Sequence, residues 1–337
     1  MKRLLLGLIL LLAATAGFAQ NRDVLLTPDG MLYTVDVMQS DDAVLGGNYL
    51  KLSARQGTSS TETLTVPESM SGVNLRPALA YDDDSDTLFV LWLHQPVNSS
   101  ANELYLASYH AGTWQQAVAL DSRSGIFQSR FNLRIAVTHR IAQSQSDGTT
   151  LDVPRLLVHA IWWEQNSTDG EGARYALVAI DKGVVSSPDV HAMSEFVLPA
   201  ERQGVNDDFN HDFLRHPTII ENSDSDSVDV VFGDINSNTL NRATLKPIAD
   251  SRVHIPVGNR GGHPIAAPKA LSVDWSGHAT TLDGHGGRMM FVNTTANAVS
   301  YVSYANGKWT AAKTIATDAN ITTDAAMAAI TKMLASE

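Results

Sequence analysis

The sequence predicts an all-β fold, a β-propeller of five blades, and repeats within the chain carry this prediction. Residues 77–94 (PALAYDDDSDTLFVLWLH) align without a gap with residues 217–234 (PTIIENSDSDSVDVVFGD), 140 residues later. Halfway between them, residues 158–164 (VHAIWWE) repeat the second half of the pattern. A period of about 70 residues, with an apolar strand, a polar Asp/Ser turn and a second apolar strand, is typical of radial all-β repeats.

The repeats divide the chain into five units with a similar order of strands and turns, at residues 25–67, 74–121, 132–193, 213–257 and 262–318. Strands such as LFVLWL lack polar alternation, so both of their faces are expected to be covered, as in a ring of packed blades. The run from Asp82 to Asp86 is expected to form the turn between the first two strands of its unit, on the face opposite the predicted site. Two alternatives stay open: a sixth blade within residues 190–212, and a β-sandwich, which leaves the repeat unexplained.

The two ends of the chain differ from the repeats. Residues 1–19 combine two positive charges, the apolar run LLLGLILLLAA and small residues, which predicts a signal peptide cleaved before Gln20 and export to the periplasm or the medium. Residues 20–318 are expected to form the propeller. Residues 319–337 place Met327, Ile330 and Leu334 on one face of a short amphipathic helix.

Composition limits the partners. A formal net charge of −12 argues against nucleic acid, which requires a cationic face, and no segment after the signal peptide is apolar and long enough for membrane insertion. The chain has no Cys, so disulfides and a thiol nucleophile are excluded. A carbohydrate or a protein remains as the expected ligand.

Two later segments carry a resemblance to a known family. SYHAGTW (residues 108–114) and SYANGKW (residues 303–309) resemble the Asp-box, Ser-x-Asp-x-Gly-x-Thr-Trp, of the sialidase-like, or BNR-repeat, β-propellers. Both are one residue short, and His110 and Ala305 stand where the family has Asp. The resemblance implies a propeller blade and a folding turn outside the catalytic centre, with the Trp wedged between neighbouring blades.

The repeat also predicts which polar residues meet at one face. If the second strand of each unit runs antiparallel to the first, residues just before the first strand and just after the second share a face. The first set is Arg76, Arg134, His216 and His263; the second set is Asp36, His94, Glu164, Asp234 and Asn293. An alternative register replaces His216 by Arg215. Three arginines would favour a ligand carboxylate, and they resemble the arginine triad of sialidases.

Chemistry at this face would need two carboxyl groups. Glu164, which follows Trp162 and Trp163, is the candidate acid, Asp234 is the candidate base, and Trp163 offers a platform for a sugar ring. These residues leave open a glycoside hydrolase, a sialidase-like enzyme or a polysaccharide lyase. Because no catalytic set is complete, the sequence favours a binding module for an acidic carbohydrate or a partner protein.

Cofactor and metal signals are weak. Asp208, Asn210 and Asp212 resemble the start of a calcium loop, but the following Gly and the distant Glu are missing, so no cofactor or metal is expected. Residues 277–288 (GHATTLDGHGGR) are rich in Gly but have no strand-to-helix pattern, so they are not expected to form a phosphate loop.

Overall fold

The structure, a computed structural model, is built almost entirely of β-strands. It describes residues 22–27, 29–40, 47–56, 59–124, 130–140, 155–166, 170–181, 184–185, 189–192, 215–221, 228–234, 239–249, 252–254, 263–265, 278–281, 286–293, 298–305, 308–309, 313–317 and 332–333.

The strands of these residues form five antiparallel sheets, each made of consecutive strands. The first two sheets contain β1 (Arg22–Leu26), β2 (Met31–Gln39), β3 (Asn48–Gln56) and β4 (Ser59–Thr65), then β5 (Val73–Asp82), β6 (Thr87–Gln95), β7 (Ala101–His110), β8 (Thr113–Trp114) and β9 (Val118–Ser124). The third contains β10 (Arg130–Arg140), β11 (Arg155–Asn166), β12 (Gly170–Asp181), β13 (Val184–Val185) and β14 (Asp189–Ala192). The fourth contains β15 (Arg215–Glu221), β16 (Val228–Asp234), β17 (Thr239–Ala249), β18 (Arg252–His254) and β19 (His263–Ile265). The fifth contains β20 (His278–Thr281), β21 (Gly286–Asn293), β22 (Ala298–Ala305), β23 (Lys308–Trp309) and β24 (Lys313–Thr317).

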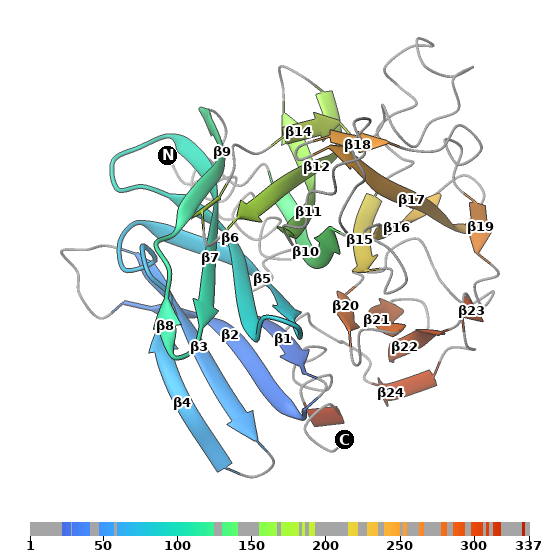
Figure 1. The fold of residues 1–337 in the computed structure, drawn as a ribbon, viewed down its shortest axis with the longest axis horizontal. Coiled ribbons are helices and arrows are strands. Elements are labelled where there is room, and N and C mark those ends of the chain that lie inside the picture. Colours follow the sequence, from blue (N-terminus) through green and yellow to red (C-terminus); the bar gives the residue numbers. More distant parts are fainter. Residues whose placement is uncertain are drawn as a thin grey trace, which may run out of the picture.

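The first strand of each sheet lies toward a common centre. β1 contacts β5, β5 contacts β10, β10 contacts β15, β15 contacts β20, and β20 in turn contacts β1. Figure 1 shows the five sheets following one another around this centre in the order of the sequence. This radial arrangement is the one that the repeat predicts.

The outer strand of four sheets is split in two. In the second sheet, one end of β7 pairs with β8 and the other end with β9, and β12, β17 and β22 are covered in the same way. The first Asp-box-like segment forms the turn from β7 to β8, and the second contains the end of β22 and both residues of β23. Trp114 packs against Tyr109, with ring centroids 5.1 Å apart, and against the apolar cluster between the first and second sheets. The predicted wedge position is confirmed for this Trp.

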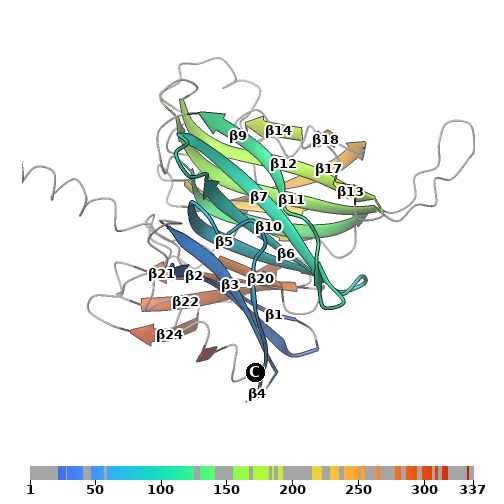
Figure 2. The ribbon, with the colours of Figure 1, turned by 90° about the vertical axis from the view of Figure 1, so that its left-hand side faces the viewer.

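β6 shows why the sheets pack face to face. Leu88, Val90 and Trp92 enter the cluster shared with the first sheet, whereas Phe89 and Leu91 enter the cluster shared with the third sheet. Successive side chains of a strand point to opposite faces, so a strand with two buried faces must be apolar throughout. The expectation for LFVLWL is confirmed, and Figure 2 shows these sheets stacked on one another.

The structure describes parts of two predicted boundaries, the start of the fifth unit and the C-terminal helix. Gly262 was expected to open the fifth unit, but residues 263–265 form β19, which pairs with β17 of the fourth sheet, so the fifth sheet begins at β20. Of the predicted C-terminal helix, Lys332 and Met333 are described and are helical. The predicted signal peptide and the calcium-like loop at Asp208, Asn210 and Asp212 lie outside the described residues.

Within the described part of the chain, no helix is long and apolar enough to cross a membrane.

Candidate functional site

Three consecutive innermost strands carry the same irregularity. In β5, β10 and β15, two residues face a single aromatic residue of the second strand: Arg76 and Pro77 face Trp92, Asn132 and Leu133 face Trp162, and His216 and Pro217 face Phe232. Such β-bulges bend a strand and re-aim its side chains. They therefore mark one edge of three neighbouring sheets.

The bulges settle the alignment of the predicted basic residues. His216 is the counterpart of Arg76, whereas Arg215 precedes the bulge of β15. Arg134 follows the bulge of β10, so its predicted equivalence with Arg76 is wrong. Arg76 and Arg134 also lie inside their strands and not before them. A repeat alignment cannot show which residue a bulge inserts.

Arg76 has an uncommon backbone. Its φ is +56°, in the left-handed region, and only 2% of its surface is exposed. This backbone conformation is about 1–2 kcal/mol less favourable for a residue with a Cβ, and Gly is the usual occupant of such a bulge position. Burial lowers the pKa of Arg76 to about 10, which still leaves the side chain protonated at neutral pH.

Arg134 of β10 interacts electrostatically with Asp23 of β1. Arg134 is 6% exposed, and its Nη1 donates to the carbonyl of Leu133 at 2.6 Å. Burial lowers the pKa of Arg134, and the Asp23 carboxylate partly opposes this shift. Asp23 Oδ2 also accepts a hydrogen bond from the backbone N–H of Leu79, 2.7 Å away in β5. Asp23, which the sequence did not single out, thus connects the inner strands of three sheets.

The residues predicted to follow the second strand of each unit lie, by backbone register, at the same edge of the sheets as the bulges. His94, Glu164 and Asp234 each lie two residues beyond the aromatic that faces a bulge, so they are equivalent in β6, β11 and β16. Antiparallel pairing places this end of the second strand beside the start of the first. The side chains of Glu164, Asp234, Trp163, Arg215, His216, His263 and Asn293 lie outside the description.

One member of the predicted ring differs from expectation. His263 pairs with Arg242 of β17, which makes it part of an outer strand and removes it from the inner ring. The fifth unit was assigned from the Pro that follows His263, and this Pro belongs to β19. Asp36 pairs with Arg22 at the start of β1, and its Oδ1 accepts a 2.5 Å hydrogen bond from Arg22 Nε.

Next to this edge, Asn74 organises a buried polar network. Its Nδ2 donates to the carbonyls of Asn48 (2.8 Å), Ser69 (2.7 Å) and Ser71 (3.3 Å). Its Oδ1 lies 3.0 Å from Trp92 Nε1 and 2.9 Å from His94 Nδ1. Asn74 is fully buried and therefore fixes His94 against the loop that precedes β5.

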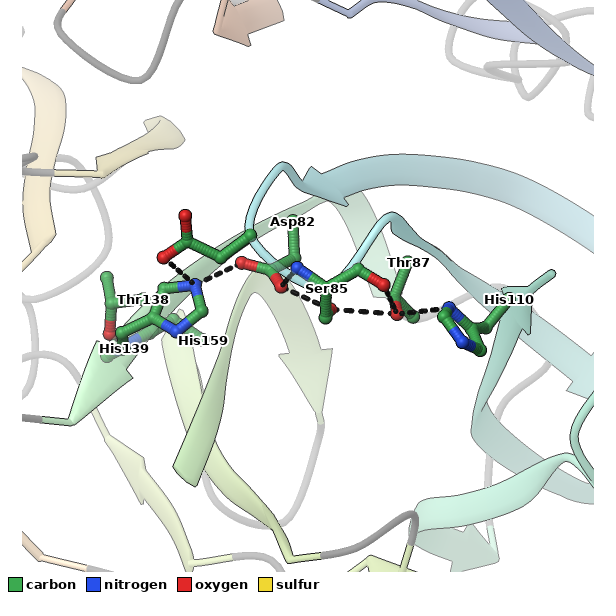
Figure 3. Close-up of polar contacts among 8 residues, drawn as sticks. Asp82, Ser85, Thr87, His110, Thr138, His139 and His159 are labelled. Carbon is green, nitrogen blue, oxygen red and sulfur yellow. Dashed lines mark hydrogen bonds and ion pairs between the residues drawn. The ribbon is translucent and has the colours of Figure 1, made fainter. Parts of the chain in front are cut away.

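The predicted turn at residues 82–86 is confirmed, and it forms a second polar cluster at the opposite end of the strands (Figure 3). Asp82 accepts hydrogen bonds from His139 of β10 and from Ser85, and His139 Nε2 lies 3.5 Å from Asp84. Burial acts to raise the pKa of Asp82, but the hydrogen bonds outweigh it, so the pKa lies below its ordinary value.

This cluster does not form a catalytic triad. Asp82 stands between Ser85 and His139, whereas nucleophile activation requires the imidazole between the hydroxyl and the carboxylate. Figure 3 shows the contacts continuing through Thr87 to His110. The cluster joins the second sheet to the third.

No protein-family model matches the chain, and no curated protein matches its sequence. Among solved structures, it is similar to the Hadza microbial sialidase Hz136, with 11% identity and a TM-score of 0.49, over 89% of this chain and 59% of the sialidase. It is also similar to the α-L-arabinanase of Penicillium chrysogenum, with 11% identity and a TM-score of 0.49, over 87% and 80% of the two chains. A third is the GH93 α-L-arabinofuranosidase of Fusarium graminearum, with 11% identity and a TM-score of 0.49, over 91% and 83%.

Proposed function

We propose that this protein is an exported, closed five-bladed β-propeller that binds an acidic carbohydrate where its innermost strands begin. The observation that carries the proposal is the burial of two guanidinium groups, Arg76 and Arg134, on neighbouring inner strands. Export rests on the signal-like residues 1–19.

The chemistry of these groups favours a carboxylate ligand. A guanidinium offers a planar fork of donors that matches a carboxylate, and removal from water strengthens the attraction. Arg76 occupies a bulge position with positive φ, where Gly would be less strained than a residue with a Cβ. Strained backbone positions of this kind cluster at ligand sites. A uronic or sialic acid presents the required carboxylate on a hydroxyl-rich ring.

The test is calorimetric binding of oligoglucuronate and sialyl-lactose to the mature chain. Arg76→Gly removes the guanidinium and keeps the backbone conformation, so affinity is expected to fall about tenfold or more. Arg134→Ala is expected to act in the same direction. Arg55→Ala, at the exposed opposite end of β3, removes an equal charge and serves as the matched control. Unchanged affinity in both site variants would refute the proposal.

A second candidate is an enzyme acting on the same glycan. It is favoured by the equivalent positions of Glu164 and Asp234, because a glycosidase needs two carboxyl groups about 5–10 Å apart. Incubation with uronate and sialyl polymers would reveal new reducing ends or unsaturated products. Turnover that disappears in both Glu164→Gln and Asp234→Asn would establish the enzyme, and absence of turnover would leave the binding function.

A further inference from the structure

A polar row crosses the whole second sheet at the edge of the candidate site. Asn74 of β5 pairs with His94 of β6, His94 pairs with Glu103 of β7, and Glu103 pairs with Ser122 of β9. Directly paired residues share a face of a sheet. The row therefore runs along one face, from the innermost strand to the outermost.

The hydrogen bonds of Asn74 determine the protonation of His94. Because Asn74 Nδ2 donates to three carbonyls, its Oδ1 must be the acceptor, and both Trp92 Nε1 and His94 Nδ1 donate to it. Burial lowers the pKa of His94, although Glu103 and Glu68 partly oppose this shift. The neutral imidazole therefore carries its proton on Nδ1 and a lone pair on Nε2.

This lone pair lies in surroundings rich in acceptors. His94 is 5% exposed, and its Nε2 makes no hydrogen bond to any residue that the structure describes. Glu103 pairs with His94 across the sheet, and its Oε1 accepts a 3.2 Å hydrogen bond from Ser122 Oγ. The carboxylates of Glu103 and Glu68 both act to raise the pKa of His94. Tyr105 also meets the His94 ring edge-on, with centroids 5.0 Å apart.

We propose that His94, Glu103 and Glu68 form a subsite for an ammonium group, and that the glycan ligand therefore carries a free amino sugar beside its acidic sugar. An ammonium supplies three donors and a positive charge, which match one lone pair and two carboxylates. Arg76 lies two residues from Asn74 in β5, so the carboxylate and ammonium subsites are adjacent. This inference rests on the proposed function and narrows its ligand to a zwitterionic glycan.

The test measures binding of a glucosamine tetrasaccharide to the mature chain by calorimetry at low salt. Its N-acetylated counterpart is the ligand control, because acetylation removes the charge and two donors. Glu103→Gln and Glu68→Gln are each expected to weaken binding of the free amine about tenfold. Asp83→Asn, an exposed carboxylate in the turn between β5 and β6, is the matched control and is expected to change nothing.

The outcomes separate this inference from the proposed function. Equal affinity for the two tetrasaccharides, or unchanged affinity in the Glu68 and Glu103 variants, would overturn it. Glu68 is exposed, so its variant decides the matter if the Glu103 variant does not fold. Binding of oligoglucuronate that depends on Arg76, without binding of the amine, would sink the subsite and leave the proposed function. The reverse pattern, binding of the amine without Arg76-dependent binding of oligoglucuronate, would refute the proposed function and overturn the zwitterionic ligand, leaving an ammonium subsite alone.

Discussion

His159 predicts a strong pH dependence of stability. It is fully buried in β11, on the face of the third sheet turned away from the second. Its Nε2 lies 2.8 Å from Thr138 Oγ1 and its Nδ1 lies 2.6 Å from Tyr175 Oη. Burial lowers the pKa of His159 to about 3, so the folded protein holds a neutral imidazole throughout the ordinary pH range.

The size of the effect follows from the difference between two pKa values. In the unfolded chain the pKa of a His is about 6.5, whereas the pKa of His159 in the folded protein is about 3. Between these two pH values the unfolded state binds a proton that the folded state does not bind. The contribution to stability is present above pH 6.5 and is lost as the pH falls toward 3. Between pH 7 and pH 4 the loss is about 3 kcal/mol.

His159→Gln tests this reasoning, because Gln retains a donor and an acceptor but does not titrate. Urea unfolding of both proteins at pH 7 and pH 4 gives the difference in stability at each pH. Wild type is expected to lose about 3 kcal/mol more than the variant between the two pH values. His110→Gln, at an exposed position, is the control. An equal loss in wild type and His159→Gln would refute the reasoning.

Three further predictions concern stability, each measured by urea unfolding. Gly72→Ala is expected to destabilise by more than about 1 kcal/mol, because φ is +72° and the new Cβ would lie 2.2 Å from the Gln95 carbonyl oxygen; Gly112→Ala has a similar φ but open space, so an equal loss would contradict the steric reason. Phe89→Ala is expected to cost about 3–5 kcal/mol, since its ring fills the interface of the second and third sheets, and a cost below about 1 kcal/mol would count against that packing. The Asp82 carboxylate stabilises wild type above the ordinary pKa of Asp, and this stability is lost as the pH falls through the lowered pKa of Asp82. Asp82→Asn is expected to lack this stability at pH 7, and a variant as stable as wild type at pH 7 would show that the Asp82 contacts contribute nothing.

The paired strands of the second, third and fourth sheets could be predicted because their apolar pattern repeats at a fixed spacing. The fifth sheet was harder. β20 lies in the Gly-rich stretch GHATTLDGHGGR, and a short polar strand there has no apolar signature. The Pro after His263 was therefore taken as the start of the fifth sheet, although residues 263–265 form β19 of the fourth sheet.

The candidate site was predicted in part. The edge shared by His94, Glu164 and Asp234 follows from antiparallel pairing, which the sequence pattern implies. Asn74 and Asp23 were missed because their roles depend on contacts with residues 26 and 56 positions away. No local pattern encodes such contacts.

The contact between β1 and β20 joins two strands that lie far apart in the sequence. Each sheet uses only consecutive strands of the described residues, so no exchanged strand fastens the first sheet to the last. Bringing β1 to β5 closes about 50 residues of chain, whereas bringing it to β20 closes about 250, which costs roughly 1.4 kcal/mol more in chain entropy. The contact between β1 and β20 therefore carries the largest chain-entropy cost of the contacts between neighbouring inner strands, and within the described residues no shared strand offsets that cost.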